Sequence, residues 1–298
     1  MDIALTILVD GLIYGAWLFL VAIGLTLVFG IMKILNVAHG ALYAVGAYAG
    51  ASLVGGYLFA TPPAALQLPL LIVAALGVAL LLGPLLEGVL LRLFYGRDEV
   101  VILLATFALS LIIEDLIKQV WGVYSYYVSE PYALFGVIEA GPLFYVGYDA
   151  FLIVVAALVG LGASAFLRLT RQGKIVVAMI HDSEICRAMG VNVSRAYLWT
   201  FTVGVFLAAL AGALIAPTLA VTPTMGVNAI ILSFAVVVIG GLGSVEGAAL
   251  GALIVGCTRA ATVHLWPEGE LFIVYAVMAA VLAVRPRGLF GMPEGRKI

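Results

Sequence analysis

Apolar runs long enough to cross a lipid bilayer follow one another along nearly the whole chain. A membrane-spanning helix needs about 20 mostly apolar residues, and candidates lie near residues 4–30, 40–59, 68–91, 100–121, 149–168, 195–216, 228–240, 247–265 and 270–285. Only 10% of the 298 residues are charged, against about 25% in soluble domains. We therefore predict an all-α integral membrane protein, a polytopic bundle of about eight or nine transmembrane helices, which forms a single domain over residues 1–298.

The lysines and arginines predict the orientation of these helices, because cytoplasmic loops of membrane proteins are enriched in them. If Arg92 and Arg97 are cytoplasmic and the helices alternate, every Lys and Arg except Lys118 and Arg259 falls on the cytoplasmic side. The opposite side collects the acidic residues Asp2, Glu130, Glu139, Asp149, Glu268 and Glu270. We expect the amino terminus outside and the carboxyl terminus in the cytoplasm.

Small residues recur in the predicted helices at spacings that allow close helix approach. The glycines concerned are Gly11, Gly15, Gly46, Gly50, Gly243, Gly247 and Gly251. We expect them to pack helices within the chain rather than to form a dimer seam. Two of these regions also look alike, "HGALYAVGA" from His39 and "EGAALGALIVG" from Glu246, which would fit the internal repeats of many transporters.

The stretch from Phe29 to Gly50 carries Lys33, Asn36 and His39 within seven positions of an otherwise apolar region. Polar residues followed by glycines and alanines predict an interrupted helix in the middle of the bundle. Non-helical backbone in a membrane must be covered by protein or line water. Two roles stay open for Asn36 and His39: they line a solute path, or they only hold the interruption together.

Polar residues also recur every four positions in the predicted helix 100–121, at Thr106, Ser110, Glu114 and Lys118. Each step of four residues turns a helix by about 40°, so they form one slowly winding stripe. Glu114 and Lys118 have the spacing of an intrahelical ion pair. The stripe is either a salt-bridged helix end near the outer interface or a wall of an outer vestibule.

Three other ionisable residues lie within predicted helices. We expect Arg259 and Glu246 to face the bundle in structural roles, and Glu87 to pair with a nearby arginine.

A polar segment from Arg168 to Phe201 separates two predicted helices, and its loop, about residues 169–195, falls on the cytoplasmic side. Lys174 to Met189 has the pattern of one short amphipathic helix, and Gly190 is suited to end it. Such a helix either lies on the membrane surface or docks a soluble partner.

The sequence lacks a HExxH motif, a Cys/His cluster, a nucleophile–base pair and a phosphate-binding glycine loop. We therefore expect no metal site, no ATP site and no enzymatic activity in this chain. A stand-alone secondary transporter or channel is the alternative class, in which Glu114, Asp115 and Lys118 would relay ions or protons.

Three segments resemble the branched-chain amino acid (LivH-type) permeases of ATP-binding-cassette (ABC) importers. The segment "AMIHDSEICRAMGVNVSR" resembles their coupling loop, "GLTLVFGIMKILNVAHGALYAVGAY" their amino-terminal signature, and "VVVIGGLGSVEGAALGALIVG" their carboxyl-terminal signature. The matching coupling-loop residues are Ala178, Asp182, Glu184, Ala188, Gly190, Asn192 and Arg195. The amino-terminal matches are Asn36, Ala38, His39, Gly40, Gly46, Ala47 and Tyr48.

The resemblance implies one half of a transmembrane channel in a bacterial inner membrane. The implied partners are a second, LivM-type permease, two ATPase subunits that bind ATP and Mg, and a periplasmic solute-binding protein; membrane lipid surrounds the bundle, and no nucleic acid is involved. No cofactor is expected in this chain. The solute would be a branched-chain amino acid, urea, an amide, or an aromatic or other carboxylate.

Two groups of residues follow from this reading as candidates. The solute path would use Asn36, His39, Tyr43, Thr106, Ser110 and Glu114. Contact with the ATPases would use Lys174, Ala178, Asp182, Glu184, Arg187, Ala188, Gly190 and Asn192.

Overall fold

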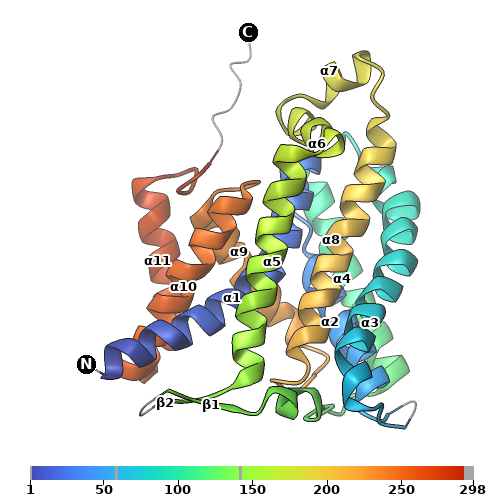
Figure 1. Ribbon diagram of the computed structural model, residues 1–298. Coiled ribbons are helices and arrows are strands. Elements are labelled where there is room, and N and C mark those ends of the chain that lie inside the picture. The colour runs from blue at the N-terminus through green and yellow to red at the C-terminus, as the bar shows by residue number, and fades with distance from the viewer. Residues whose placement is uncertain (1, 58–59, 141–142, 292–298) are drawn as a thin grey trace.

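A computed structural model describes residues 2–57, 60–140 and 143–291 as a bundle of long helices (Figure 1). The helices longer than a few turns are α1 (Asp2–Met32), α2 (Ala38–Val54), α3 (Ala64–Leu85), α4 (Glu99–Trp121), α5 (Gly147–Leu169), α6 (Arg171–His181), α8 (Val193–Ile215), α9 (Met225–Gly240), α10 (Val245–Leu265) and α11 (Glu270–Val284). The short helix α7 (Ser183–Ala188) lies between α6 and α8.

Short elements complete the described chain. They are η1 (Leu86–Leu90) and η2 (Leu91–Phe94), which continue α3, together with η3 (Pro131–Phe135), η4 (Pro267–Gly269) and the antiparallel strands β1 (Val137–Ala140) and β2 (Leu143–Val146). The two strands form a hairpin in which Val137 is opposite Val146. This hairpin had no counterpart among the sequence predictions.

The predicted helical bundle is confirmed. Each of the nine predicted spans coincides with a helix, and in the described residues six helices are long and apolar enough to cross a membrane: α1, α3 with its continuation, α4, α5, α8 and α10. The helices α2, α9 and α11 are shorter, with 17, 16 and 15 residues.

The core forms where α1, α2, α8, α9 and α10 pack against one another. Helix α8 is largely buried, whereas α3, α4 and α5 expose broad apolar faces. In a membrane protein, lipid or a partner subunit can cover such faces without the cost that water would impose.

Glycine allows the closest approaches in this core, as predicted. A β-carbon on Gly15 of α1 would lie 3.0 Å from the Ala252 carbonyl of α10, and one on Gly46 of α2 would collide with backbone atoms of Ala209 in α8. The predicted packing within the chain is therefore confirmed at these positions.

Figure 1 shows α6 and α7 at one end of the bundle and the β1–β2 hairpin at the other. The last described residues, which follow α11, end on the side of α6 and α7. We call the end with α6 and α7 the loop end, and the opposite one the hairpin end.

Candidate functional site

The interruption predicted between the first two helices is present. Helix α1 ends at Met32 and α2 begins at Ala38, so Lys33 to Val37 form a non-helical segment, which we call the α1–α2 break. Lys33 has a φ of 55°, a left-handed backbone that non-glycine residues rarely adopt. Its neighbour Ile34 and Asn36 are buried, whereas Lys33 is exposed, so the break enters the protein from its surface.

Thr106 of α4 holds this break. Its hydroxyl accepts a hydrogen bond from the Val37 amide at 3.2 Å, and its one proton can go to the Leu35 carbonyl at 3.2 Å or to the Leu103 carbonyl of α4 at 3.0 Å. The side chain is fully buried. Thr106 thus satisfies the Val37 amide, a backbone group outside the helices, which stabilises the break.

Asn36 is the polar side chain of the break that remains unpaired. It is 1% exposed, and neither its amide nitrogen nor its amide oxygen has a hydrogen-bond partner among the described residues. A buried amide without partners is costly, and such groups are uncommon in proteins. Asn36 is therefore the residue of the break whose side chain makes no hydrogen bond to the described residues.

His39 follows in the first turn of α2 and is also buried. Its Nε2 lies 3.0 Å from the Val21 carbonyl of α1. A β-carbon on Gly24 would lie only 2.8 Å from His39 Cε1, so the ring fits against this glycine. The contacts of His39 join α1 to α2.

Tyr43, one turn further along α2, is buried in the core. It lies at a close approach of α2 and α8, since a β-carbon on Gly212 would collide with the Tyr43 carbonyl.

A cleft opens beside the break, between α2, α4 and the start of α9. It holds about 450 Å³ of empty space, open solvent at its mouth included. The lining residues are Val37, Ala41, Phe107, Ser110, Leu111, Glu114, Ile117, Pro223, Gly226, Val227 and Ile230. At one side of the cleft, Gly40 and Gly226 are packed so closely that a β-carbon on either would meet the other's backbone.

The polar stripe of α4 divides between the break and this cleft. Thr106 points to the break, while Ser110 and Glu114 line the cleft. The predicted Glu114–Lys118 ion pair is confirmed at 2.8 Å, and Asp115 also contacts Lys118 at 3.2 Å. Of the six path candidates, the structure thus brings Ser110 and Glu114 to the cleft, with Thr106 and Asn36 at the adjacent break; His39 and Tyr43 lie in the core.

The apolar lining from α9 was missed by the sequence predictions. Gly226, Val227 and Ile230 carry no signal of their own, because an apolar residue at a cleft looks like any other apolar residue of a span.

The loop predicted as one helix over 174–189 consists of two helices, so that prediction is wrong in detail. Helix α6 ends at His181 and α7 begins at Ser183. Between them, the Asp182 carboxylate accepts hydrogen bonds from the amides of Glu184 and Ile185, both at 2.9 Å. Asp182 is therefore the N-cap of α7, a role that competes with continuation of α6.

Gly190 and Asn192 shape the other end of this loop. Gly190 has a φ of 86°, as predicted for a residue that ends a helix. The Asn192 side chain accepts a hydrogen bond from the Arg195 amide at 3.0 Å and caps α8.

The remaining docking candidates lie on the surface of the loop. Lys174, Ala178, Glu184, Arg187 and Ala188 are exposed. Two apolar side chains missed as candidates accompany them, Ile185 and Met189, of which Met189 is 81% exposed. An exposed apolar tip with charges around it is suited to bind another protein.

The other predicted polar contacts are partly revised. Arg259 pairs with Glu270 and lies over the Tyr14 ring. Glu87 accepts a hydrogen bond from the Tyr95 hydroxyl at 2.7 Å, and no arginine of the described chain lies within ion-pair distance of it. Burial and this bond raise the pKa of Tyr95, which keeps the phenol protonated.

Comparison with known proteins gives these features a family context. The family model described as the permease component of the branched-chain amino acid transport system matches residues 7–282. The chain belongs to this family. The matched range includes the α1–α2 break, the cleft and the loop of α6 and α7.

Several relatives match along almost their full length. The chain is 28% identical to the high-affinity branched-chain amino acid transport permease LivH of Escherichia coli K12, over 97% of this chain and 96% of the relative. It is 30% identical to BraD of Pseudomonas aeruginosa, a permease of the same description, over 98% and 97% of the two chains. A probable LivH of Methanocaldococcus jannaschii is 28% identical, over 96% and 92%.

A solved structure shares the fold. A chain of PsaBC from Streptococcus pneumoniae, solved in complex with Fab, has a TM-score of 0.50, with 93% of this chain and 91% of that chain covered. The sequence identity of 9% limits this likeness to the fold. The family and the apolar helices together indicate a multi-pass permease component of the bacterial inner membrane.

Proposed function

We propose that this chain is the permease subunit of an ABC importer, which moves branched-chain amino acids or a related small polar or carboxylate solute inward by alternating access. The observation that carries the proposal is the exposed loop of α6 and α7 in a chain that matches the permease family over residues 7–282. The chain itself provides no ATP hydrolysis. Energy comes from two separate ATPase subunits that bind ATP and Mg.

The loop end is the cytoplasmic side in this proposal, which places the amino terminus outside and the carboxyl terminus inside. The ATPases contact α6 and α7 through the charged residues around Glu184 and Arg187 and through the apolar tip at Ile185 and Met189. A periplasmic solute-binding protein delivers solute at the hairpin end. The second half of the channel is a homologous, LivM-type permease.

The solute path in this proposal runs through the cleft between α2, α4 and α9. The Glu114 and Ser110 side chains and the cleft's apolar lining fit a small solute with both polar and apolar parts. The unpaired Asn36 amide lies at the neighbouring break, where it can hydrogen-bond solute or water in a state that opens the break. His39 and Tyr43 then support the path from the core.

The first test is to tag the chain, solubilise native membranes gently and identify the proteins that co-purify. Two ATP-binding subunits and a second permease are expected, and the associated binding protein can then be screened for its ligand. A chain that purifies alone, and that transports solute in liposomes without ATP, would instead identify a stand-alone transporter.

The docking surface is tested by charge reversal at Glu184 and Arg187 together, and separately by Met189→Asp. Both variants should reduce co-purification of the ATPases while the second permease stays bound. Glu139→Lys, an exposed residue of the β1–β2 hairpin, is the matched control and should leave the ATPases bound. Unchanged ATPase recovery in both loop variants would contradict docking at α6 and α7.

A further inference from the structure

Helix α6 is firmly joined to the end of α5. The Thr170 hydroxyl accepts a hydrogen bond from the Gly173 amide at 2.9 Å and contacts the Phe166 carbonyl at 2.8 Å. Gly173 itself packs so tightly that a β-carbon there would collide with the same carbonyl. A displacement of α6 must therefore carry the end of α5 with it.

At Gly30, helix α1 is approached both by the last turn of α6 and by the other interruption of the bundle. This is the α9–α10 turn, residues 241–244, which we define by its glycines Gly241 and Gly243 with φ of 105° and 86°. A β-carbon on Gly30 of α1 would lie 3.2 Å from Gly243 Cα and 3.6 Å from Ile180 Cδ1 of α6. Ile180 of α6 and Gly243 of the turn thus both lie beside Gly30 of α1, three residues before the α1–α2 break.

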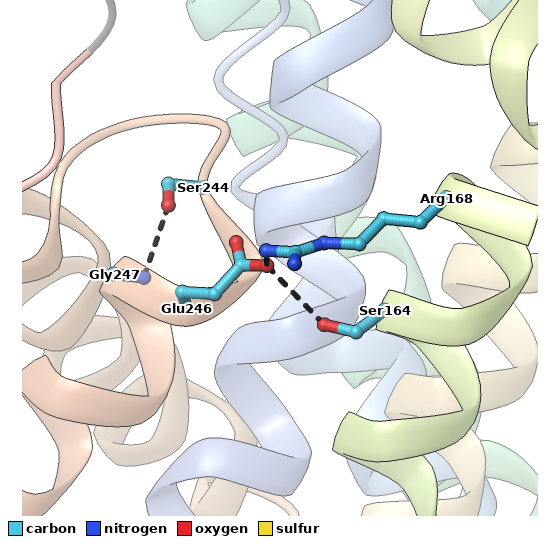
Figure 2. A network of polar contacts seen from close by, with 5 residues as sticks. All are labelled: Ser164, Arg168, Ser244, Glu246 and Gly247. Atoms are coloured by element: carbon cyan, nitrogen blue, oxygen red, sulfur yellow. Dashed lines mark hydrogen bonds and ion pairs between the residues drawn. The ribbon is translucent and has the colours of Figure 1, made fainter.

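A second contact joins α5, to which α6 is attached, to α10, which follows the α9–α10 turn. Arg168, in the last turn of α5, pairs with Glu246, in the first turn of α10, at 2.7 Å (Figure 2). Ser164 of α5 lies 3.4 Å from the same Glu246 oxygen. The turn that precedes Glu246 is fixed by Ser244, whose hydroxyl accepts a hydrogen bond from the Gly247 amide at 3.0 Å.

The exposure of this pair indicates a contact that can form and break. The Arg168 side chain is 72% exposed and the Glu246 side chain 47%, so Glu246 does not face the bundle interior as the sequence had suggested. Ion pairs with this exposure add little to folding stability. Arg168–Glu246 is instead well placed to favour one arrangement of α5 and α10 over another.

We propose that Arg168 and Glu246 are positioning residues for transport, which together with the Ile180–Gly30–Gly243 contact convey displacement of α6 and α7 to the α9–α10 turn and the α1–α2 break. This inference rests on the proposed function, because the ATPases supply the displacement. Neither residue lines the cleft proposed as the solute path. Their role is to link two elements whose relative position decides whether the break is closed.

The test uses the importer complex purified through the tagged chain and reconstituted in liposomes, with solute uptake and ATP hydrolysis measured together. Arg168→Glu and Glu246→Arg should each lower the amount of solute moved per ATP hydrolysed by about fivefold or more, while ATP hydrolysis continues. A fivefold change is about the lower end of typical couplings between two sites of a protein. The double variant restores the opposite charges and should return the ratio to within about twofold of the unaltered complex. A purely structural role would not give hydrolysis without transport.

Glu99→Gln is the control, since it removes an exposed charge at the start of α4 that lies outside the cleft and outside α5, α6 and α10; its transport per ATP should not change. Single reversals with an unchanged ratio, or a swap that fails to restore it, would overturn the inference. If the unaltered chain recovers no ATPase, the proposed function fails instead, so the two failures are distinguishable.

Hydrogen exchange on the purified chain gives a second readout that needs no ATPase. The backbone amides of Lys33–Val37 should exchange several-fold faster in each single reversal and return to the original rate in the swap, if the contact reaches the break. Equal exchange in all four proteins would contradict the proposed link, whatever the transport result.

Discussion

The two interruptions of the bundle, the α1–α2 break and the α9–α10 turn, each end one helix and start the next, but with different residues. The turn places glycine at both positions of positive φ, and Ser244 caps the helix that follows. The break places Lys33 in the left-handed region, has no side-chain cap at the start of α2, and buries Asn36 without a partner. Gly243 of the turn packs beside Gly30 of α1, three residues before the break.

This difference separates a relaxed connection from a strained one. Strained backbone and unpaired buried groups persist where surrounding structure enforces them, and they concentrate at functional sites. The α9–α10 turn follows the ordinary rules for ending one helix and starting another. The break violates them beside the cleft that we propose as the solute path.

The two similar segments "HGALYAVGA" and "EGAALGALIVG" occupy corresponding places in the two interruptions. Both segments begin the helix that follows an interruption, with His39 in the first turn of α2 and Glu246 in the first turn of α10. His39 is buried against α1, whereas Glu246 is half-exposed and reaches α5.

The largest effect on stability should come from Gly243→Ala in the turn. The substitution adds backbone strain, at φ 86°, and brings a β-carbon to 3.0 Å from Gly30 Cα. The free energy of unfolding should fall by about 2–4 kcal/mol, measured by denaturation in detergent. Gly162→Ala in α5, where a β-carbon meets nothing within 4 Å, should be neutral or stabilising; equal losses in both variants would contradict the special role of Gly243.

Thr106→Val should have the next largest effect, this time on the break. The variant keeps the shape of the side chain but leaves the Val37 amide and the Leu35 carbonyl without the hydroxyl. Unpaired buried groups cost about 1–3 kcal/mol, which a shift in the unfolding midpoint would report. Thr258→Val removes a hydroxyl that contacts only the Ile254 carbonyl within its own helix and should cost less.

Ser244→Ala tests the cap of the turn. Loss of the hydrogen bond from the Gly247 amide should lower the free energy of unfolding by about 1 kcal/mol, and Ser244→Gly by only a few tenths. The same unfolding assay applies. A loss as large as that of Gly243→Ala would mean that the turn depends on the cap rather than on its backbone conformation.

Lys33→Gly should have the smallest effect on stability and the opposite sign. Glycine removes the left-handed penalty at φ 55° but adds freedom to the unfolded chain, so a gain of about 0–1 kcal/mol is expected. Lys33→Val should be destabilising, because β-branched residues tolerate this conformation least. A clear loss of stability in Lys33→Gly would show that the lysine side chain, not its backbone, matters at the break.

Apolar runs and residue spacing predicted the helices well, because burial in a bilayer depends on composition and length. Spacing alone also predicted the Glu114–Lys118 pair and the role of Gly190. Asp182 was misread as a helical residue, since an aspartate can either continue a helix or cap the next one, and tertiary context decides which.

Contacts between distant segments could not be predicted from the sequence. Arg168 and Glu246 are 78 positions apart, and the cleft combines side chains from three helices. No local pattern encodes which apolar residues of α9 line that cleft, or that Thr106 of the polar stripe turns away from it toward the break.

The most direct test of the account is solute uptake by the reconstituted complex that carries Asn36→Leu. Leucine fills a similar volume and removes a buried amide without partners, so the chain should unfold no more easily than before. We expect uptake to fall at least about tenfold, which corresponds to about 1.4 kcal/mol of lost stabilisation during transport. Uptake within about twofold of the unaltered complex, at full stability, would contradict a role for the break in transport.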